Sequence, residues 1–134
     1  EARRAEDAPG VFGARRIGIV TPGDAAYAAQ AAHGLGRELA GYRALGQVNN
    51  HEAAAVPASR IIALARDLAA GTTLDAILLW STNLFGLDAM APLEAELGIP
   101  VIDSAAAGVH GALRVIGADM TPATPLGRIF AQAA

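Results

Sequence analysis

The chain has 134 residues, a formal net charge of −3 and no cysteine. This length suits one domain, and the absence of cysteine excludes disulfides, thiolate metal sites and cysteine catalysis. The small charge and the scattered basic residues, which form no stripe interleaved with aromatic residues, make nucleic acid a poor candidate partner.

The first third of the chain predicts two strands joined by one helix. Residues 1–14 are charged and contain proline and glycine, and they are expected to form a lead-in segment. The apolar run Arg15–Thr21 predicts a strand that ends at the turn signal Pro22-Gly23. An alanine-rich helix is expected from its N-cap, Asp24, to about Leu39, followed by a second strand over Tyr42–Val48.

The middle of the chain repeats this alternation. Asn49–Glu52 is polar and is expected to be a loop, and Pro57 then opens a helix that ends near Gly71. Asp75–Trp80 is the strongest strand pattern in the sequence. Ser81-Thr82-Asn83 ends this strand, and Leu84–Leu97 predicts the next helix.

The last part adds one further strand and helix. Ile99–Ile102 predicts a short strand that stops at Asp103-Ser104, and Ala105–Ile116 predicts a helix. Residues 118–134 contain two prolines and are expected to form a C-terminal tail, with a short helical piece over Leu126–Gln132.

Four strand–helix units over residues 15–117 predict an α/β domain. Continuous apolar strands with helical crossovers indicate a three-layer, flavodoxin-like domain with a four-stranded parallel sheet. Ligands of such sheets bind beyond the carboxyl ends of the strands. The polar loops expected at this end are Thr21-Pro22-Gly23, Asn49-Asn50, Ser81-Thr82-Asn83 and Asp103-Ser104.

Ser81-Thr82-Asn83 lies between a strand and a helix, where hydroxyl groups and free backbone N–H groups are expected to face an incoming anion. The same residue types are also the usual helix caps. On spacing alone, capping without a ligand is the more common role.

Several segments of the chain agree in order and spacing with one enzyme family. They include Arg15-Arg16-Ile17, Thr21-Pro22, Asn50, Glu52, Ile77–Leu84, Leu87-Asp88-Ala89, Glu94, Leu97-Gly98, Pro100-Val101, Ser104, Ala107-Gly108, Leu113–Gly117 and Gly127–Phe130. Together they resemble the second half of arylmalonate decarboxylases and maleate cis-trans isomerases, members of the aspartate/glutamate racemase superfamily, over about residues 14–130.

The resemblance implies a cofactor-independent isomerase, racemase or decarboxylase that acts on a small carboxylate. Enzymes of this superfamily have two similar halves with the active site between them, and each half usually supplies one acid/base position. The chain resembles only one half, so a missing segment or a second copy is expected to complete the site, and a homo-oligomer is expected. We expect no metal, no other cofactor, no membrane association and a cytoplasmic location.

Two positions depart from the family pattern. Ser81 stands where the family has its second-half cysteine, and an unassisted hydroxyl cannot shuttle a proton as a thiol with a pKa of about 8.5 can. Gly23 stands where the family has a carboxylate-binding tyrosine, although Tyr27 lies one helical turn later. The resemblance therefore gives Ser81 as the candidate catalytic residue. The candidate substrate-binding residues are Thr82, Asn83, Asn50, Thr21 and Gly23.

Three alternatives remain open: an active isomerase or decarboxylase, a non-catalytic carboxylate-binding domain that lacks the family cysteine, and a structural unit that pairs with another subunit.

His110 is the only other credible acid/base, and a packing or surface role is favoured for it. Glu94 is expected to be a solvated charge. Gly34-Leu35-Gly36 falls inside the first helix and is therefore no dinucleotide motif.

Overall fold

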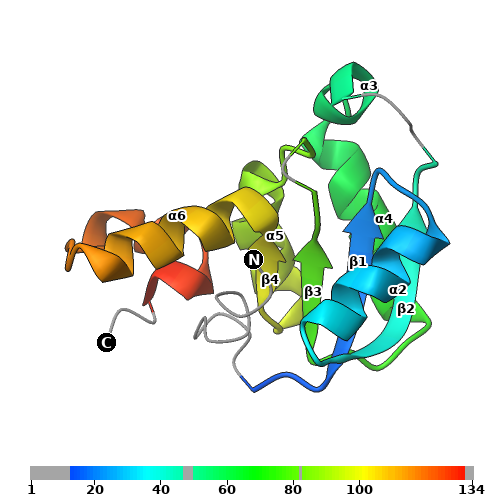
Figure 1. Cartoon of the computed structure of the whole chain (residues 1–134), viewed down its shortest axis with the longest axis horizontal. Coiled ribbons are helices and arrows are strands. Elements are labelled where there is room, and N and C mark those ends of the chain that lie inside the picture. The colour runs from blue at the N-terminus through cyan, green and yellow to red at the C-terminus, as the bar shows by residue number, and fades with distance from the viewer. Residues whose placement is uncertain (1–12, 47–49, 82, 132–134) are drawn as a thin grey trace.

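The computed structural model describes residues 13–46, 50–81 and 83–131. Its centre is a four-stranded parallel sheet with the strand order β2-β1-β3-β4 (Figure 1). The strands are β1 (Arg16–Thr21), β2 (Glu38–Ala44), β3 (Ala76–Leu79) and β4 (Val101–Asp103). The α/β class and the parallel four-stranded sheet predicted from the sequence are confirmed.

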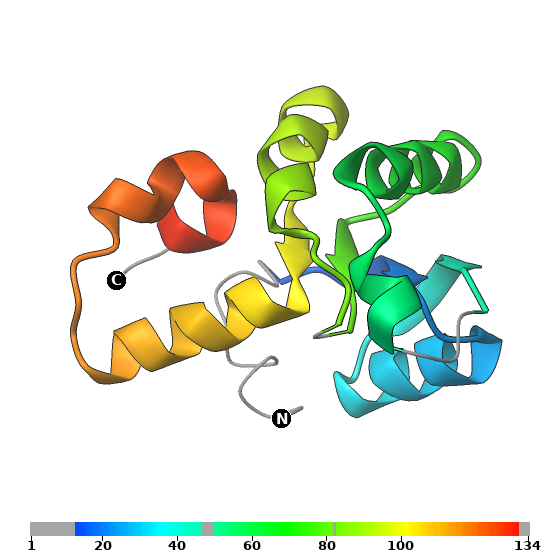
Figure 2. The same ribbon diagram turned by 90° about the horizontal axis from the view of Figure 1, so that it is seen from above.

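Helices cover both faces of the sheet. They are α2 (Ala25–Gly34), α3 (Asn50–Ala54), α4 (Ala58–Ala70), α5 (Leu87–Leu97), α6 (Ser104–Val115) and the 3-10 helices η2 (Thr121–Leu126) and η3 (Arg128–Ala131). Helix α2 lies on one face, and α4 and α5 lie side by side on the other, which gives the expected three layers (Figure 2). Helix α6 extends outward beyond the β4 edge of the sheet (Figure 1). No helix in the described ranges has the length and apolar character needed to cross a membrane.

The core is aliphatic and is centred on the two inner strands. Ile17, Ile19, Val20, Ile77 and Leu79 are completely buried between the helical layers. Burying a side chain of this size contributes roughly 1.5–3 kcal/mol relative to leaving it in water. The rigid centre of the sheet is therefore formed by β1 and β3, the strands that the sequence pattern marks most clearly.

The first helix is shorter than predicted, and β2 begins earlier. Helix α2 ends at Gly34, and Gly36 has a φ of 68°, a left-handed conformation that ends the helical path. The N–H of Glu38 then donates to the carbonyl of Arg15 at 2.9 Å, which starts the β1–β2 pairing. The predicted helix over 24–39 and strand over 42–48 are wrong at this boundary because tertiary pairing overrides the alanine-rich pattern.

Two further boundaries differ from the prediction. The segment expected as a loop at 49–52 contains the short helix α3, in which the buried Ala53 contacts the core side and Glu52 lies in the first turn. Helix α5 begins at Leu87 rather than Leu84, because the N–H of Gly86 donates to Asp103, on the neighbouring strand, instead of continuing a helix toward Ser81.

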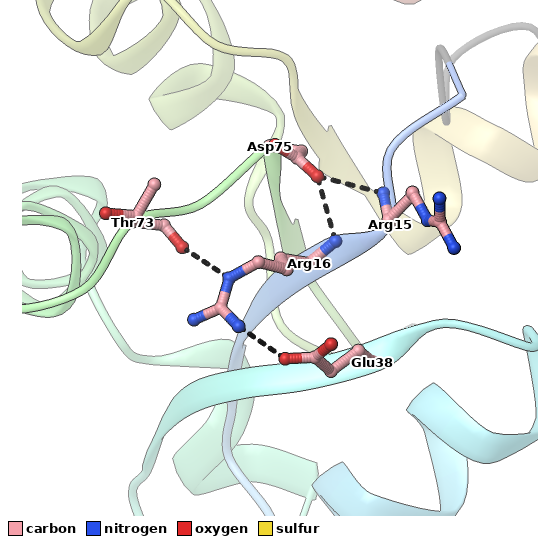
Figure 3. A network of polar contacts seen from close by, with 5 residues as sticks. All are labelled: Arg15, Arg16, Glu38, Thr73 and Asp75. Carbon is pink, nitrogen blue, oxygen red and sulfur yellow. Dashed lines mark hydrogen bonds and ion pairs between the residues drawn. The ribbon is translucent and has the colours of Figure 1, made fainter.

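A polar network holds the amino ends of the three longest strands together (Figure 3). The carboxylate of Asp75 accepts the backbone N–H groups of Arg15 and Arg16, at 3.0 and 2.9 Å. These two bonds lower the pKa of Asp75. The guanidinium of Arg16 also contacts the carbonyl of Thr73 and the carboxylate of Glu38. The network fixes the register of β1 against β2 and β3 at the end of the sheet away from the polar loops.

The segment after α6 folds back onto α5 through a buried carboxylate. Glu94 accepts the N–H of Val101 at 3.0 Å and the N–H of Arg128 at 2.9 Å, and it is almost completely buried. The expectation that Glu94 is a solvated charge is therefore wrong. Two backbone donors compensate its burial, and they tie β4 and η3 to the same helix.

Candidate functional site

The candidate site lies where the chain leaves β1, β3 and β4 at their carboxyl ends. Val20 pairs with Leu79, and Leu79 pairs with Asp103, so Thr21, Ser81 and Ser104 follow these pairs on adjacent strands. The chain continues from β1 to one side of the sheet and from β3 to the other, which makes the gap between these strands the switch point where such folds bind ligands.

Three hydroxyl groups at this end each accept a backbone N–H. Thr21 Oγ1 accepts the N–H of Gly23 at 3.1 Å, and Ser104 Oγ accepts the N–H of Ser81 at 3.1 Å. Ser81 Oγ in turn accepts the N–H of Asn83 at 3.2 Å. Two of these bonds lie within a predicted polar loop, and the bond from Ser81 to Ser104, the first residue of α6, joins the loops that follow β3 and β4.

This arrangement corrects one expectation. The N–H groups of the Ser81-Thr82-Asn83 segment are expected from the sequence to be free for an anion, but those of Ser81 and Asn83 are each satisfied by a hydroxyl oxygen within the chain. A hydroxyl that accepts an N–H keeps its own O–H for donation. The accepted bond also polarises that O–H. The hydroxyl groups of the partly buried Ser81 and Ser104, rather than the amides behind them, are therefore the donors that a ligand meets first.

The predicted site residues differ in exposure. Thr21 is fully buried, whereas Gly23, Ser81 and Asn83 are partly buried. Thr82 lies outside the described residues, as does the side chain of Asn50, whose backbone begins α3. Helix α3 lies beyond the carboxyl ends of the strands (Figure 1), at the same end of the sheet as Ser81.

Tyr27 lies next to the position where the family tyrosine is missing. A Cβ added to Gly23 would meet Cβ and Cγ of Tyr27 at 3.3 Å. Asp24, the N-cap of α2, accepts the N–H of Tyr27 at 2.9 Å and fixes the start of this helix as predicted. Tyr27 is 39% exposed, so this residue combines contact with the Gly23 turn and access from solvent.

Asp103 supports the site; the sequence places it in a polar loop at this end of the sheet, but it is not among the predicted site residues. It is almost completely buried, accepts the N–H of Gly86 through Oδ1 at 3.1 Å, and caps α6 by accepting the N–H of Ala106 through Oδ2 at 3.0 Å. Burial raises the pKa of Asp103, although the N–H groups of Ala106, Gly86 and Ala105 act in the opposite direction. The only available signal was its position at the end of a strand and before a helix.

Ser81 lies in the site without a base at hydrogen-bond distance among its described contacts. Its backbone carbonyl accepts the N–H of Leu84, and its hydroxyl accepts the N–H of Asn83. An N–H stabilises a developing alkoxide but does not remove the proton, which a serine nucleophile requires from a neighbouring base. The geometry therefore favours Ser81 as a donor to a ligand.

The remaining titratable candidates are placed differently. His110 is completely buried on α6, with its ring edge-on to Phe130 at a centroid distance of 6.2 Å, which fits a packing role. In the parts of the chain that the structure describes, no three His, Asp or Glu side chains gather closely enough to hold a metal ion.

Comparisons with known proteins agree with the resemblance read from the sequence. The structure of the Nocardia farcinica maleate cis-trans isomerase, a Cys-to-Ser mutant with a covalently bound succinylcysteine intermediate, matches with a TM-score of 0.84 and 26% identity, over 98% of this chain and 54% of that one. A crystal structure of arylmalonate decarboxylase matches with a TM-score of 0.79 and 27% identity, over 95% of this chain and 58% of that one. The chain thus spans a little over half the length of these solved relatives.

Comparison with curated protein sequences yields no match. The family model described as arylmalonate decarboxylase, in contrast, matches residues 7–130, which is most of the chain. The chain therefore belongs to the arylmalonate decarboxylase family.

Proposed function

We propose that the chain supplies one half of the active site of a cofactor-independent isomerase or decarboxylase, and that this half binds a small carboxylate. One observation supports the proposal above the others: the hydroxyl groups of Thr21, Ser81 and Ser104, at the ends of three adjacent strands, each accept a backbone N–H. Ser81 and Ser104 are only partly buried, so they keep an O–H for a ligand. Family membership supplies the reaction class.

The proposed chemistry needs donors that are already in position. When a carbon beside a carboxylate loses a proton or carbon dioxide, negative charge develops on the carboxylate oxygens of the resulting enediolate. Donors aimed at these oxygens stabilise the transition state without reorganisation. Ser81 and Ser104 would bind one carboxylate oxygen each, and Asn83 would close the site from the start of the next loop. Thr21, which is buried, would hold the Gly23 turn.

We also propose that Tyr27 replaces the carboxylate-binding tyrosine that the family has at the position of Gly23. Cβ and Cγ of Tyr27 lie beside Gly23, and in this proposal its hydroxyl would approach the ligand from the α2 side.

A serine in place of a cysteine is compatible with ligand binding in this fold. The Nocardia farcinica isomerase was captured with a succinylcysteine intermediate in a Cys-to-Ser mutant. The hydroxyl of Ser81 would therefore donate a hydrogen bond to the substrate carboxylate. The group that transfers the proton would come from a second half-domain or a second copy, which completes the site.

The change Ser81→Cys tests the assignment. It restores a thiol that can shuttle a proton near neutral pH, and we expect it to raise exchange of the α-proton of a substituted malonate, aspartate or maleate-derived substrate in deuterated water, followed by NMR. The matched control is Ser104→Cys, which adds a thiol to a neighbouring hydroxyl position. No gain from Ser81→Cys, or an equal gain from both variants, would contradict a catalytic position at Ser81.

A second function, a carboxylate-binding domain without turnover, is favoured by one feature of the site. Ser81 has an amide donor at its hydroxyl, and this bond stabilises bound negative charge but starts no proton transfer. Thermal-shift measurements with maleate, malonate, aspartate and phosphate distinguish the two functions. Stabilisation by a dicarboxylate, with no proton exchange in the wild type or in Ser81→Cys, would favour the binding domain.

A further inference from the structure

The amino ends of β1 and β2 border a hollow of about 400 Å³, at the end of the sheet away from the hydroxyl groups of the candidate site. This volume falls in the range of small-molecule pockets, roughly 300–1,000 Å³. Two of the residues that line the hollow carry a guanidinium group. The lining residues are Gly13, Ala14, Arg15, Gly36, Arg37 and Glu38.

Arg15 and Arg37 form a like-charged pair across the two strands. Arg16 is in register with Glu38, and the N–H of Glu38 donates to the carbonyl of Arg15 at 2.9 Å. Arg15 and Arg37, one residue earlier on each strand, therefore leave the backbone side by side. Like charges opposite each other on neighbouring strands are unfavourable, so a negative charge bound between these two residues would be stabilising.

The next pair along the strands is balanced in charge. Arg16 and Glu38 form an ion pair at 2.5 Å. Figure 3 shows the guanidinium of Arg15 pointing away from this ion pair. Among the residues that the structure describes, no carboxylate forms an ion pair with Arg15 or Arg37. The positive charge of the hollow is therefore uncompensated by a direct partner within this part of the chain.

The guanidinium of Arg37 is weakly held. Its Nη1 contacts the carbonyl oxygens of Leu35 and Gly36 at 3.4 and 3.5 Å, longer than the roughly 2.7–3.2 Å of a well-formed N–H···O bond. Its Nε is buried and has no acceptor in the described ranges. A buried donor without an acceptor is unfavourable, so Arg37 has donors available for a ligand.

We propose that the hollow binds a phosphate group between the guanidinium groups of Arg15 and Arg37. A guanidinium binds two oxygens of one phosphate through parallel N–H groups, and a phosphate carries a charge of about −1.5 to −2 at neutral pH, which two arginines balance. Gly13 and Gly36 have φ values of 71° and 68°. Because neither has a Cβ, a ligand can approach the backbone closely beside both arginines.

The size and the charge of the hollow narrow the ligand further. The carboxylate of Glu38 also lines the hollow, but it is bound by Arg16 and does not cancel the charge of the arginine pair. The hollow is larger than one phosphate ion, so the expected ligand is a small phosphate ester. The site is separate from the proposed carboxylate site and does not depend on it.

Titration of the nitrogen-15-labelled full chain with inorganic phosphate, at constant ionic strength, tests the proposal. We expect saturable shifts of the backbone amide signals of Arg15, Gly36 and Arg37 and of the side-chain Nε–H of Arg37. Sodium chloride at the same ionic strength should produce none of them. A parallel titration with glycerol 3-phosphate distinguishes the sources: tighter binding assigns the site to phosphate esters, and equal or weaker binding assigns it to free phosphate.

Arg15→Gln and Arg37→Gln should each raise the dissociation constant of phosphate at least about tenfold, because each removes charge-assisted hydrogen bonds. The matched control is Arg60→Gln, which removes the same charge from an exposed position on the first turn of α4, outside the hollow. Its dissociation constant should change by less than about twofold, because solvent and salt screen a distant charge.

Circular dichroism shows whether the variants are folded, and thermal unfolding gives a second readout. Phosphate should raise the Tm of the wild type and of Arg60→Gln, and it should leave the Tm of Arg15→Gln and Arg37→Gln nearly unchanged. No saturable shift, the same response to chloride, or equal weakening by all three glutamine variants would overturn the proposal.

Phosphate shifts that are largest at Ser81 and Asn83 would also overturn it, because they would place the anion at the other end of the sheet. Malonate binding is read from those amides, so failure of the phosphate site is distinguishable from failure of the proposed function.

Discussion

Replacing Asp103 with asparagine removes one of the two acceptors that organise the base of the site. Oδ1 of Asp103 accepts the N–H of Gly86, and Oδ2 accepts the N–H of Ala106. A carboxamide has one acceptor oxygen, so one N–H loses its partner and faces an amide NH2. A buried donor without an acceptor costs about 1–3 kcal/mol. We expect Asp103→Asn to lower the free energy of unfolding by about 2 kcal/mol.

Urea denaturation followed by circular dichroism measures this loss, and Asp24→Asn is the matched control. Asp24 caps α2 from an exposed position and accepts one N–H, that of Tyr27. Asparagine keeps this single acceptor, so the control should change the free energy of unfolding by less than about 0.5 kcal/mol. Equal losses in the two variants would refute the argument that Asp103 bridges two helix starts.

The pH dependence of the same variant tests the burial of Asp103. Burial raises its pKa above the ordinary value of 3.8, so the folded state binds the proton more tightly than the unfolded state. The stability contributed by Asp103 is then fully present below the unfolded pKa and declines as the pH rises through the folded pKa. The stability difference between wild type and Asp103→Asn should shrink with rising pH. A difference that grows with pH would show that the hydrogen bonds outweigh burial.

Three further changes give distinct outcomes. Gly18→Ala should destabilise the fold by about 1–2 kcal/mol in thermal unfolding, because its Cβ would come within 2.8 Å of a leucine side chain, whereas Gly71→Ala, with no atom within 4 Å, should be close to neutral. Asp75→Asn should destabilise the protein at neutral pH but have little effect at strongly acidic pH, because the lowered pKa of Asp75 gives stability that is lost as the pH falls through it. Ser104→Ala removes the acceptor for the N–H of Ser81, and calorimetry with malonate should show weaker binding and an unchanged number of sites.

The sequence pattern predicts the fold well where burial decides the structure. The continuous apolar runs at Ile17–Val20 and Ala76–Leu79 become the buried inner strands. The start of β2 could not be predicted in the same way, because Glu38 and Leu39 continue an alanine-rich helical pattern and are drawn into the sheet by pairing with β1. The pattern also gives no sign of which distant backbone groups reach a side chain, and for this reason the burial of Glu94 was missed.

The sequence predicts which residues share one end of the sheet, but it does not predict the hydrogen bonds between them. Spacing places Ser81 and Thr21 at the same end of the sheet, as parallel strands require. The spacing does not show that hydroxyl oxygens accept hydrogen bonds from the backbone N–H groups of the site. The bond from the N–H of Ser81 to Ser104, for example, joins residues 23 positions apart. The supporting role of Asp103 could not be predicted for the same reason, since its contact joins the end of β4 to Gly86, the N-cap of α5.

The most direct test of the account is a titration of the nitrogen-15-labelled chain with malonate, followed through the backbone amide signals. We predict that the largest shifts occur at Gly23, Ser81 and Asn83, whose N–H groups bind the hydroxyl oxygens of the site, and that uncharged malonamide produces none. Saturable shifts that are largest around Asp75, at the opposite end of the sheet, or no response to malonate at millimolar concentration, would contradict a carboxylate site at the ends of β1 and β3.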